Sequence, residues 1–316
     1  PPSSLLAMEG ANILVNISAS NELIGKHHYL RSLIRQQSAR CMAGYVYTSA
    51  GFGESSTDLV FAGNGIIAEN GNLLEESPRF TMQEQLIISE IDVENLQNDR
   101  RVNTSFMHGA STLLPEETIV VPFALSETSG DPVLTRPIDP HPFTPSDDAL
   151  KERCEEIFQI QVAGLAKRMV HTHSKTAVVG ISGGLDSTLA LLVTVMTFDA
   201  LGIPRNQILG ITMPGFGTTD RTYTNACDLI RSLGVTLKEI SIKDACLQHF
   251  KDINHDPSVH DVTYENSQAR ERTQILMDVA NQENGMVIGT GDLSELVLGW
   301  ATYNGDHMSM YGAMSL

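Results

Sequence analysis

Small, flexible and acidic residues stand together at residues 182–187, whose sequence is Ser-Gly-Gly-Leu-Asp-Ser. Apolar residues precede this stretch at 177–181 and follow it at 189–193. Such an order is typical of a buried strand that leads through a Gly-rich turn into a helix. Two adjacent glycines let successive backbone N–H groups converge, and the N-terminus of a helix favours negative charge. The stretch therefore predicts a phosphate-binding loop.

Asp186 is a carboxylate inside this predicted loop. It would repel phosphate groups unless a cation lay between them, so its presence indicates a bound Mg²⁺. An ordinary strand-to-helix turn capped by Ser182 or Asp186 is the simpler alternative. The loop lacks the Lys of the Walker A pattern and the glycine spacing of the dinucleotide-binding pattern, so neither of those two folds is predicted.

A second Gly-rich turn, with the sequence Gly-Thr-Gly-Asp-Leu-Ser-Glu at residues 289–295, follows another predicted strand. Asp292 and Glu295 have the spacing of a capping box, which would satisfy helix N–H groups and need no other function. The alternative is that Glu295 and Asp186 together form a two-carboxylate Mg²⁺ site on nucleotide phosphates.

A predicted helix over residues 264–283 carries two pairs of polar residues at helical spacing. Asn266 and Arg270 share one face, as do Gln268 and Arg272. Arginine presents planar donors suited to phosphate or carboxylate, although a solvated, charged helix face would show the same pattern.

Trp300 and Tyr303 lie in a polar segment bounded by glycines, and Trp300 is the only tryptophan of the chain. Aromatic residues in such a segment are poorly placed for a core and well placed to stack on a flat ring.

The elements that must position these residues alternate regularly in the second half of the chain. Short apolar strands are predicted at 176–181, 207–212, 236–241 and 286–289, with helices near 187–201, 219–233, 243–252 and 264–283. A further helix is predicted after a cap at Ser146. This alternation indicates an α/β domain with a doubly wound parallel sheet, which binds ligands at the carboxyl ends of its strands.

The first half of the chain predicts a layered sheet with a flanking helix. Strands are predicted at 11–17, 44–48, 59–61, 65–68 and 86–89, and the helix ends near Arg40. Residues 98–146 are rich in proline and lack strong periodicity, which indicates an irregular connection between two domains.

The composition limits the partners of the chain. Its 316 residues carry 38 acidic and 21 basic side chains, and the formal net charge of −17 argues against nucleic acid and anionic membranes as partners. No apolar run reaches the ~20 residues of a membrane span and no signal peptide opens the chain, so a cytoplasmic location is predicted. The four cysteines lack metal-ligand spacing. The chain starts without Met, and we expect it to be a fragment of a longer protein.

Residues 182–187 resemble the PP-loop of the ATP pyrophosphatases, which cleave ATP between its α and β phosphates. Together with residues 264–272 and 289–309, they resemble the synthetase domain of the glutamine-dependent NAD synthetases almost letter for letter. This resemblance implies a C–N ligase that adenylates the nicotinate carboxylate of deamido-NAD with Mg²⁺ and ATP. Release of pyrophosphate and attack by ammonia would then give the amide.

The resemblance also implies roles for single residues. Asp186 and Glu295 would be catalytic and would hold the metal, and Arg270 and Arg272 are candidate phosphate contacts. The implied ATP-binding residues are Ile181, Ser182, Gly183, Gly184, Leu185, Asp186, Ser187, Thr188 and Thr290. The implied deamido-NAD-binding residues are Asn266, Glu295, Trp300, Ala301, Thr302 and Tyr303.

The first half resembles part of the nitrilase-type glutaminase domain of the same enzymes, at residues 1–4, 16–20, 37–40, 45–47 and 53–55. The resemblance implies that the Cys, Glu and Lys that release ammonia from glutamine lie outside this chain. Cys41 is expected to be an inert buried thiol and no substitute nucleophile. Ser20 and Lys26 match positions that contact glutamine, and a homo-oligomer is implied for the complete enzyme.

We therefore expect a partial nitrilase-like α/β sandwich at residues 1–97, a connector at 98–146 and a PP-loop NAD synthetase domain at 147–316. Another PP-loop amidotransferase, such as GMP or asparagine synthetase, is one alternative, although those families use different glutaminase domains. A nucleotide-binding module without catalysis is the other.

Overall fold

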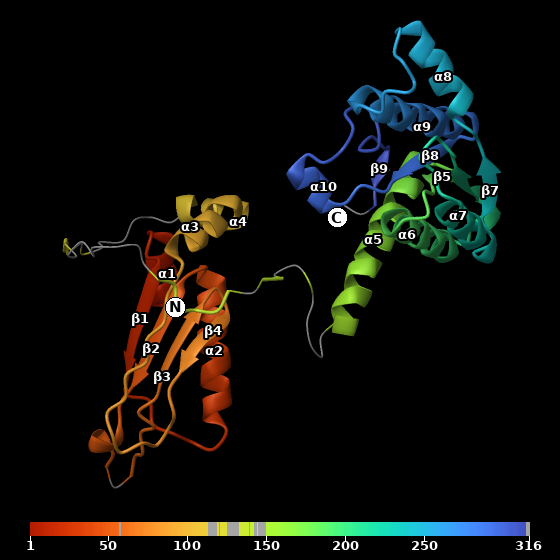
Figure 1. Cartoon of the computed structure of the whole chain (residues 1–316). Helices are drawn as coiled ribbons and strands as arrows, with labels where there is room; N and C mark the ends of the chain where they lie inside the picture. The colour runs from red at the N-terminus through yellow and green to blue at the C-terminus, as the bar shows by residue number, and fades with distance from the viewer. Residues whose placement is uncertain are drawn as a thin grey trace. The chain divides into compact units, whose positions relative to one another are not determined.

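The computed structural model describes residues 1–56, 58–112, 119, 121–124, 133–138, 140–141, 144 and 150–313. The chain divides into two compact units, Pro1–Pro140 and His141–Leu316 (Figure 1). Within the described residues, each unit is built on its own sheet. The domain limits expected at residues 97 and 146 stay a prediction.

Unit 1 contains a mixed sheet whose strands lie side by side in chain order. Its strands are β1 (Ile13–Ser18), β2 (Gly44–Ser49), β3 (Gly65–Glu69) and β4 (Asn72–Glu76). The first pair is parallel and the other two pairs are antiparallel. Helices α1 (Pro2–Met8) and α2 (Lys26–Cys41) supply Ala7 and Ile34 to a core that includes Leu14, Tyr45 and Ile66.

The opposite face of β1 is exposed. Leu14 is buried in the core, whereas Ile13, Val15 and Ile17 are 45, 67 and 84% exposed. Because side chains alternate between the two faces of a strand, the apolar residues of β1 place one row inward and one row in solvent.

The structure corrects two predicted strands and one predicted irregular segment. Residues 59–61 and 86–89 are not strands. The second of these segments instead packs on the sheet, where Ile87 lies over Gly65, and Ile91 just after the segment lies over Gly44. β4, which was not predicted, follows a tight turn in which Asn70 and Gly71 both have positive φ.

Residues 98–102 and 104–112 are helical and not irregular, since they belong to α3 (Val93–Val102) and α4 (Thr104–Thr112). Asp92 caps α3 by accepting a hydrogen bond from Asn95 N. Arg100 then donates to the carbonyl oxygens of Ala11, Cys41 and Met42. These long-range contacts hold α3 against the rest of unit 1. Hydrophobic periodicity within the segment could not predict them.

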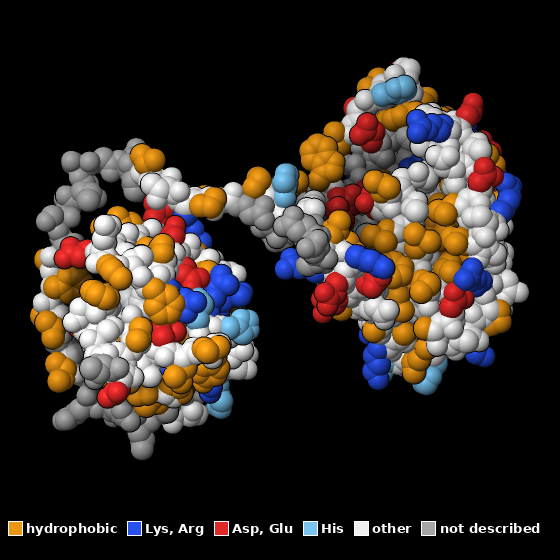
Figure 2. Space-filling model, turned by 90° about the horizontal axis from the view of Figure 1, so that it is seen from below, with side chains coloured by type: hydrophobic (Ala, Val, Ile, Leu, Met, Phe, Trp, Pro, Cys, Tyr) orange, Lys and Arg blue, Asp and Glu red, His pale blue; other side chains and the backbone are white. Residues whose placement is uncertain are grey.

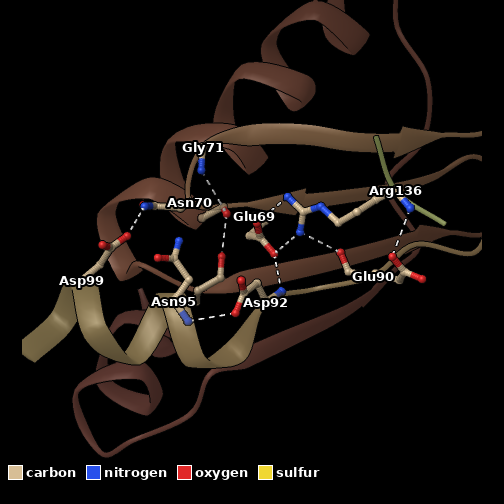
Figure 3. A network of polar contacts seen from close by, with 10 residues as sticks. Glu69, Asn70, Gly71, Glu90, Asp92, Asn95, Asp99 and Arg136 are labelled. Carbon is tan, nitrogen blue, oxygen red and sulfur yellow. Dashed lines mark hydrogen bonds and ion pairs between the residues drawn. The ribbon is translucent and has the colours of Figure 1, made fainter. Parts of the chain in front are cut away.

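An ion-pair network ties residues 133–138 to unit 1 (Figure 3). The Arg136 guanidinium donates to both carboxylate oxygens of Glu69 at 3.0 Å. Glu69 also accepts from Asp92 N, and Glu90 accepts from the backbone N–H groups of Thr135 and Arg136. This part of the predicted connector is therefore attached to unit 1.

Unit 2 contains a parallel sheet with the strand order β7-β6-β5-β8-β9 among its described residues. The strands are β5 (Thr176–Gly180), β6 (Ile208–Thr212), β7 (Thr236–Glu239), β8 (Gly285–Gly289) and β9 (Tyr311–Gly312). The strand order reverses beside β5, so β5 and β8 flank a crevice of the kind that binds ligands in such sheets.

Helices cover both faces of this sheet (Figure 1). On one face α5 (Leu150–Thr172), α6 (Leu185–Leu201) and α7 (Asp220–Ser232) pack against Ala177 and Val179. On the other face α8 (Lys243–Asp252) and α9 (Val262–Gln282) pack against Val178. The predicted doubly wound parallel sheet is thus confirmed. Among the described residues, the other helices are α10 (Leu293–Leu298) and η3 (Arg205–Gln207) in unit 2 and η1 (Phe52–Glu54) in unit 1. The predicted cap at Ser146 lies outside the described residues.

The described part of the chain has no helix with the length and apolar character needed to cross a bilayer. On the face seen in Figure 2, basic side chains stand beside acidic or uncharged ones and form no continuous basic surface in the part of the chain that is coloured.

Candidate functional site

A cavity of about 690 Å³ lies at the carboxyl ends of the central strands of unit 2. Gly180 and Ile181 line it at the end of β5, Thr212 and Met213 at the end of β6, and Gly289 at the end of β8. The cavity therefore occupies the position that the strand order predicts for a ligand.

The predicted phosphate-binding loop forms one wall of this cavity. Gly183 has φ +87°, a left-handed conformation that side chains strongly disfavour. A Cβ atom at this position would also collide with the carbonyl oxygen of Thr222, at the start of α7. Both constraints explain why a glycine stands at the turn before α6.

The hydroxyl groups of the loop bind one another and the loop backbone. Ser187 is buried, and its Oγ accepts from Ser182 N at 3.3 Å and lies 3.2 Å from Ser182 Oγ. Thr188 Oγ1 donates to Gly184 O at 2.8 Å. Gly184 is the N-cap of α6 and provides no side-chain cap, so the first N–H groups of α6 remain available to an anion.

Asp186 and Glu295 line the same cavity from different strand ends. Glu295 forms the predicted capping box, because its Oε2 accepts from Asp292 N while Asp292 Oδ1 accepts from Glu295 N. The capping box and the cavity position thus occur together in one residue. The exposed Asp186 has no hydrogen-bond or ion-pair partner among the described residues.

These two carboxylates suit a Mg²⁺ ion that is bound by protein carboxylates on one side and by the phosphates of a ligand on the other. Mg²⁺ is usually bound through one or two carboxylates together with substrate phosphates and water. Asp186 is exposed toward the cavity and Glu295 keeps one carboxylate oxygen outside the capping box. No cluster of three or more His, Cys, Asp or Glu side chains that could hold a metal ion occurs in the residues that the structure describes.

Gln268 and Arg272 attach α9 to the segment that follows β6. Gln268 Oε1 accepts from Phe216 N at 3.1 Å, and Arg272 Nε donates to Met213 O at 3.3 Å. Both side chains line the cavity. Burial lowers the pKa of the Arg272 guanidinium, because desolvation disfavours its charged form.

Asn266 and Arg270 attach α9 to the aromatic segment. Asn266 Oδ1 accepts from Thr302 Oγ1 at 2.9 Å, and Arg270 Nε donates to Tyr303 O at 3.0 Å. The two pairs predicted from helical spacing therefore hold different segments of unit 2.

Trp300 and Tyr303 do not line the cavity, and they are 79 and 74% exposed. Ala301 lines a smaller hollow of about 40 Å³ that shares Glu295 and Asp306 with the cavity. The structure therefore brings the loop, Thr290 and Glu295 together and leaves both aromatic rings outside.

The cavity also has lining residues to which sequence reasoning assigned no role. His260 stacks on Tyr264 with ring centroids 4.3 Å apart, and Tyr264 stacks on the buried Phe250 at 5.6 Å. His260 and Tyr264 line the cavity together with Phe216. His260 lies just before α9 and Tyr264 in its first turn, and this spacing of four residues was the signal that could have indicated them.

In unit 1 the predicted glutamine contacts are Ser20, which follows β1, and Lys26, the first residue of α2. Ser20 is half-buried, and Lys26 Nζ donates to Asn21 O at 2.5 Å. Cys41 is buried as predicted, and its Sγ accepts from Gln37 Nε2 at 3.2 Å.

The sequence of the chain is similar to those of known proteins. Residues 157–313 match the family model described as NAD synthase. A glutamine-dependent NAD(+) synthetase of Mycobacterium leprae is 44% identical over 319 residues, which cover 98% of this chain and 47% of that protein. The chain belongs to the glutamine-dependent NAD(+) synthetase family.

Other members of the NAD synthetase group cover different shares of the chain. An NH(3)-dependent NAD(+) synthetase of Pyrobaculum aerophilum is 37% identical over 155 residues, which are 48% of this chain and 55% of that protein. A solved glutamine-dependent NAD+ synthetase of Acinetobacter baumannii, in complex with ADP, has a TM-score of 0.49 at 22% identity and covers 98% of this chain and 49% of that one. The relatives found by sequence carry the assignment to the NAD synthetase family. The chain spans about half the length of the curated relatives it matches.

Proposed function

We propose that unit 2 amidates deamido-NAD to NAD in an ATP-dependent reaction that passes through an acyl-adenylate. The observation that carries this proposal is the cavity that the Gly-rich loop, Asp186 and Glu295 line together at the carboxyl ends of the sheet. The membership of the chain in the glutamine-dependent NAD(+) synthetase family supports it.

ATP would bind at the loop, at residues 181–188 and Thr290. The N–H groups at the start of α6 and the exposed hydroxyl of Ser182 are donors that could reach its phosphates. Asp186 and Glu295 would hold Mg²⁺, which when bound offsets the negative charge that these carboxylates and the phosphates bring together.

Deamido-NAD would bind near Asn266, Glu295 and residues 300–303, with Arg270 and Arg272 as candidate phosphate contacts. An oxygen of its nicotinate carboxylate attacks the α-phosphorus of ATP, and the bond to the β-phosphate oxygen breaks to release pyrophosphate. Ammonia then attacks the acyl carbon, AMP leaves, and one proton is lost from nitrogen. The residues of the cavity contribute mainly position and charge, since the carboxylate becomes electrophilic through its adenylate leaving group.

Unit 1 would be part of a nitrilase-like domain that supplies ammonia from glutamine, with Ser20 and Lys26 as glutamine contacts. The exposed apolar row on β1 supports a two-sheet arrangement, because a second sheet would remove that row from water. The cytoplasmic location, the homo-oligomeric state and the domain limits stay predictions.

Pyrophosphate release tests the proposal. With ATP, Mg²⁺ and ammonium chloride, we expect release that depends on deamido-NAD. Glutamine in place of ammonium should support none in this chain, because the implied glutaminase Cys, Glu and Lys are outside it. Absence of release with ammonium would contradict the proposed reaction. Release that depends on xanthosine monophosphate would favour the alternative amidotransferase, and nucleotide binding without turnover would favour a non-catalytic module.

A further inference from the structure

Gln268 is a buried polar side chain in the wall of the cavity, and both ends of its amide are hydrogen-bonded. Its exposed fraction is 6%. Its Oε1 accepts from Phe216 N at 3.1 Å, and its Nε2 donates to Tyr264 O at 3.1 Å. The amide therefore contacts protein backbone at both ends, with its acceptor directed at the segment that follows β6.

The two backbone partners of Gln268 also meet through their rings. The ring centroid of Phe216 lies 5.7 Å from that of Tyr264 and 6.5 Å from that of the buried Phe250. Aromatic pairs at such separations are favourable beyond the area that they bury. Phe216 is thus attached to α8 and α9 through its ring and to α9 through its backbone N–H.

Gly215 fits between two side chains of α9 because it has no side chain of its own. A Cβ atom there would lie 2.7 Å from Gln268 Oε1 and 2.7 Å from Arg272 Nη2. Arg272 Nε also donates to Met213 O at 3.3 Å. Gln268 and Arg272 are four residues apart on one helix face, so a single rigid element holds residues 213–216 on both sides of Gly215.

Two further hydrogen bonds involve residues 213–216. Gly215 N donates to Thr218 Oγ1 at 3.0 Å, and Ile242 N donates to Pro214 O at 3.3 Å. In the described part of the chain, neither of these bonds involves Phe216. The end of the segment at Phe216 therefore depends on Gln268 for its backbone contact.

Residues 213–216 lead directly into the wall that supports the predicted phosphate-binding loop. Met213 and Phe216 line the cavity. Three residues after Phe216, Thr219 caps α7 by accepting from Thr222 N at 3.3 Å. The carbonyl oxygen of Thr222 is the atom with which a Cβ atom on Gly183 would collide. The position of residues 213–216 thus influences both the cavity wall and the packing of α7 on the loop.

We infer that Gln268 is a positioning residue for ATP. By holding residues 213–216 on α9, it arranges the cavity wall at the end of β6 and the start of α7 before the nucleotide arrives. Such advance arrangement lowers the ordering cost of binding. This inference rests on the proposed function for the identity of the nucleotide. The residues proposed to contact deamido-NAD are different ones, so we expect the effect to be confined to ATP.

Gln268→Met tests the inference, because methionine has a similar unbranched shape and only a weak acceptor. In the ligand-free chain, we expect the hydrogen-exchange protection factor of the Phe216 amide to fall about tenfold. In calorimetric titrations, we expect ATP to bind about tenfold more weakly and the affinity for deamido-NAD to stay unchanged. Gln268→Glu keeps an acceptor oxygen one turn from Arg272, and it should restore most of both losses.

Gly215→Ala is a second variant, which disturbs the same contact from the other side. Its Cβ atom would displace the ends of Gln268 and Arg272, so it should reproduce both losses, and it decides the test if Gln268→Met does not fold. Gln274→Met is the matched control, since Gln274 is exposed on the same helix. It should change neither the protection of Phe216 nor either affinity.

Unchanged protection of Phe216 in Gln268→Met and Gly215→Ala would overturn the inference, as would lost protection with unchanged ATP affinity. An equal loss of both affinities with a lower Tm would also overturn it, because that result describes a general structural role. If the unmodified chain binds no ATP, the proposed function fails. Loss of Phe216 protection confined to the two variants would then still support the anchoring of residues 213–216 by Gln268.

Discussion

Gly183 and Thr222 approach so closely that a Cβ atom on the glycine would collide with the carbonyl oxygen of the threonine. The predicted phosphate-binding loop before α6 is therefore packed against the first turn of α7. The combination of this contact with a positive φ makes Gly183 the most restrictive position of the candidate site.

Gly183→Ala should lower the stability of unit 2 by about 1–3 kcal/mol, because strained backbone and the collision add. We expect a lower Tm and at least about tenfold weaker ATP binding, measured by calorimetry. Gly53→Ala is the control, since a Cβ atom there would meet open space and the φ of Gly53 lies outside the left-handed region. An unchanged Tm in the Gly183→Ala variant would show that the loop and α7 can separate at little cost.

Asp186→Asn and Glu295→Gln should each slow pyrophosphate release by about 10²-fold or more, because each removes one charge from the proposed Mg²⁺ site. A Gln side chain can still accept the capping hydrogen bond from Asp292 N, so Glu295→Gln keeps the helix cap and removes only the negative charge. We expect both variants to need more Mg²⁺ for half-maximal rate. A Glu295→Gln protein with normal rate and Mg²⁺ dependence would leave Glu295 only its role in the cap.

Tyr223 should stay protonated well above the usual range of a tyrosine. Its hydroxyl donates to Glu239 Oε2, which raises the pKa of Tyr223 to about 12 from an ordinary value of 10.0. Burial also raises the pKa of Tyr311, so an ultraviolet titration should show late ionisation of both tyrosines, and Glu239→Gln should return only Tyr223 toward 10.0. If all tyrosines titrated together in the unmodified protein, the bond would not persist in solution.

The attachment of residues 133–138 to unit 1 should weaken in acid. The N–H groups of Thr135 and Arg136 lower the pKa of Glu90 from its ordinary value of 4.5. Its contribution is therefore fully present above pH 4.5 and is lost as the pH falls through the lower, folded-state pKa. The protection factor of the Thr135 amide, which corrects for the slower intrinsic exchange in acid, should fall in that window, whereas Glu90→Gln should show a low protection factor at neutral pH as well.

The sequence predicted most of unit 2 and less of unit 1. In unit 2, apolar strands alternate with amphipathic helices, and this local signal was sufficient for β5 to β8 and α6 to α9. In unit 1, the apolar segment at 86–89 has strand composition but packs across Gly65 through Ile87, and α3 is held by Arg100 bonds to distant carbonyl groups. Composition alone could not distinguish these packed segments from strands or connectors.

Short stretches of sequence were sufficient to predict the Gly-rich turn at 182–187, the capping box of Asp292 and Glu295, and the parallel sheet. Glycine conformation, helix capping and side-chain periodicity each depend on only a few neighbouring residues. Only the tertiary structure decided which α9 side chains meet which segment: Arg272 reaches Met213, and Arg270 reaches Tyr303. It also placed His260 and Tyr264 in the cavity and left Trp300 outside. Contacts between residues tens of positions apart depend on strand order and on the crossing of helices, and no short stretch of sequence contains that information.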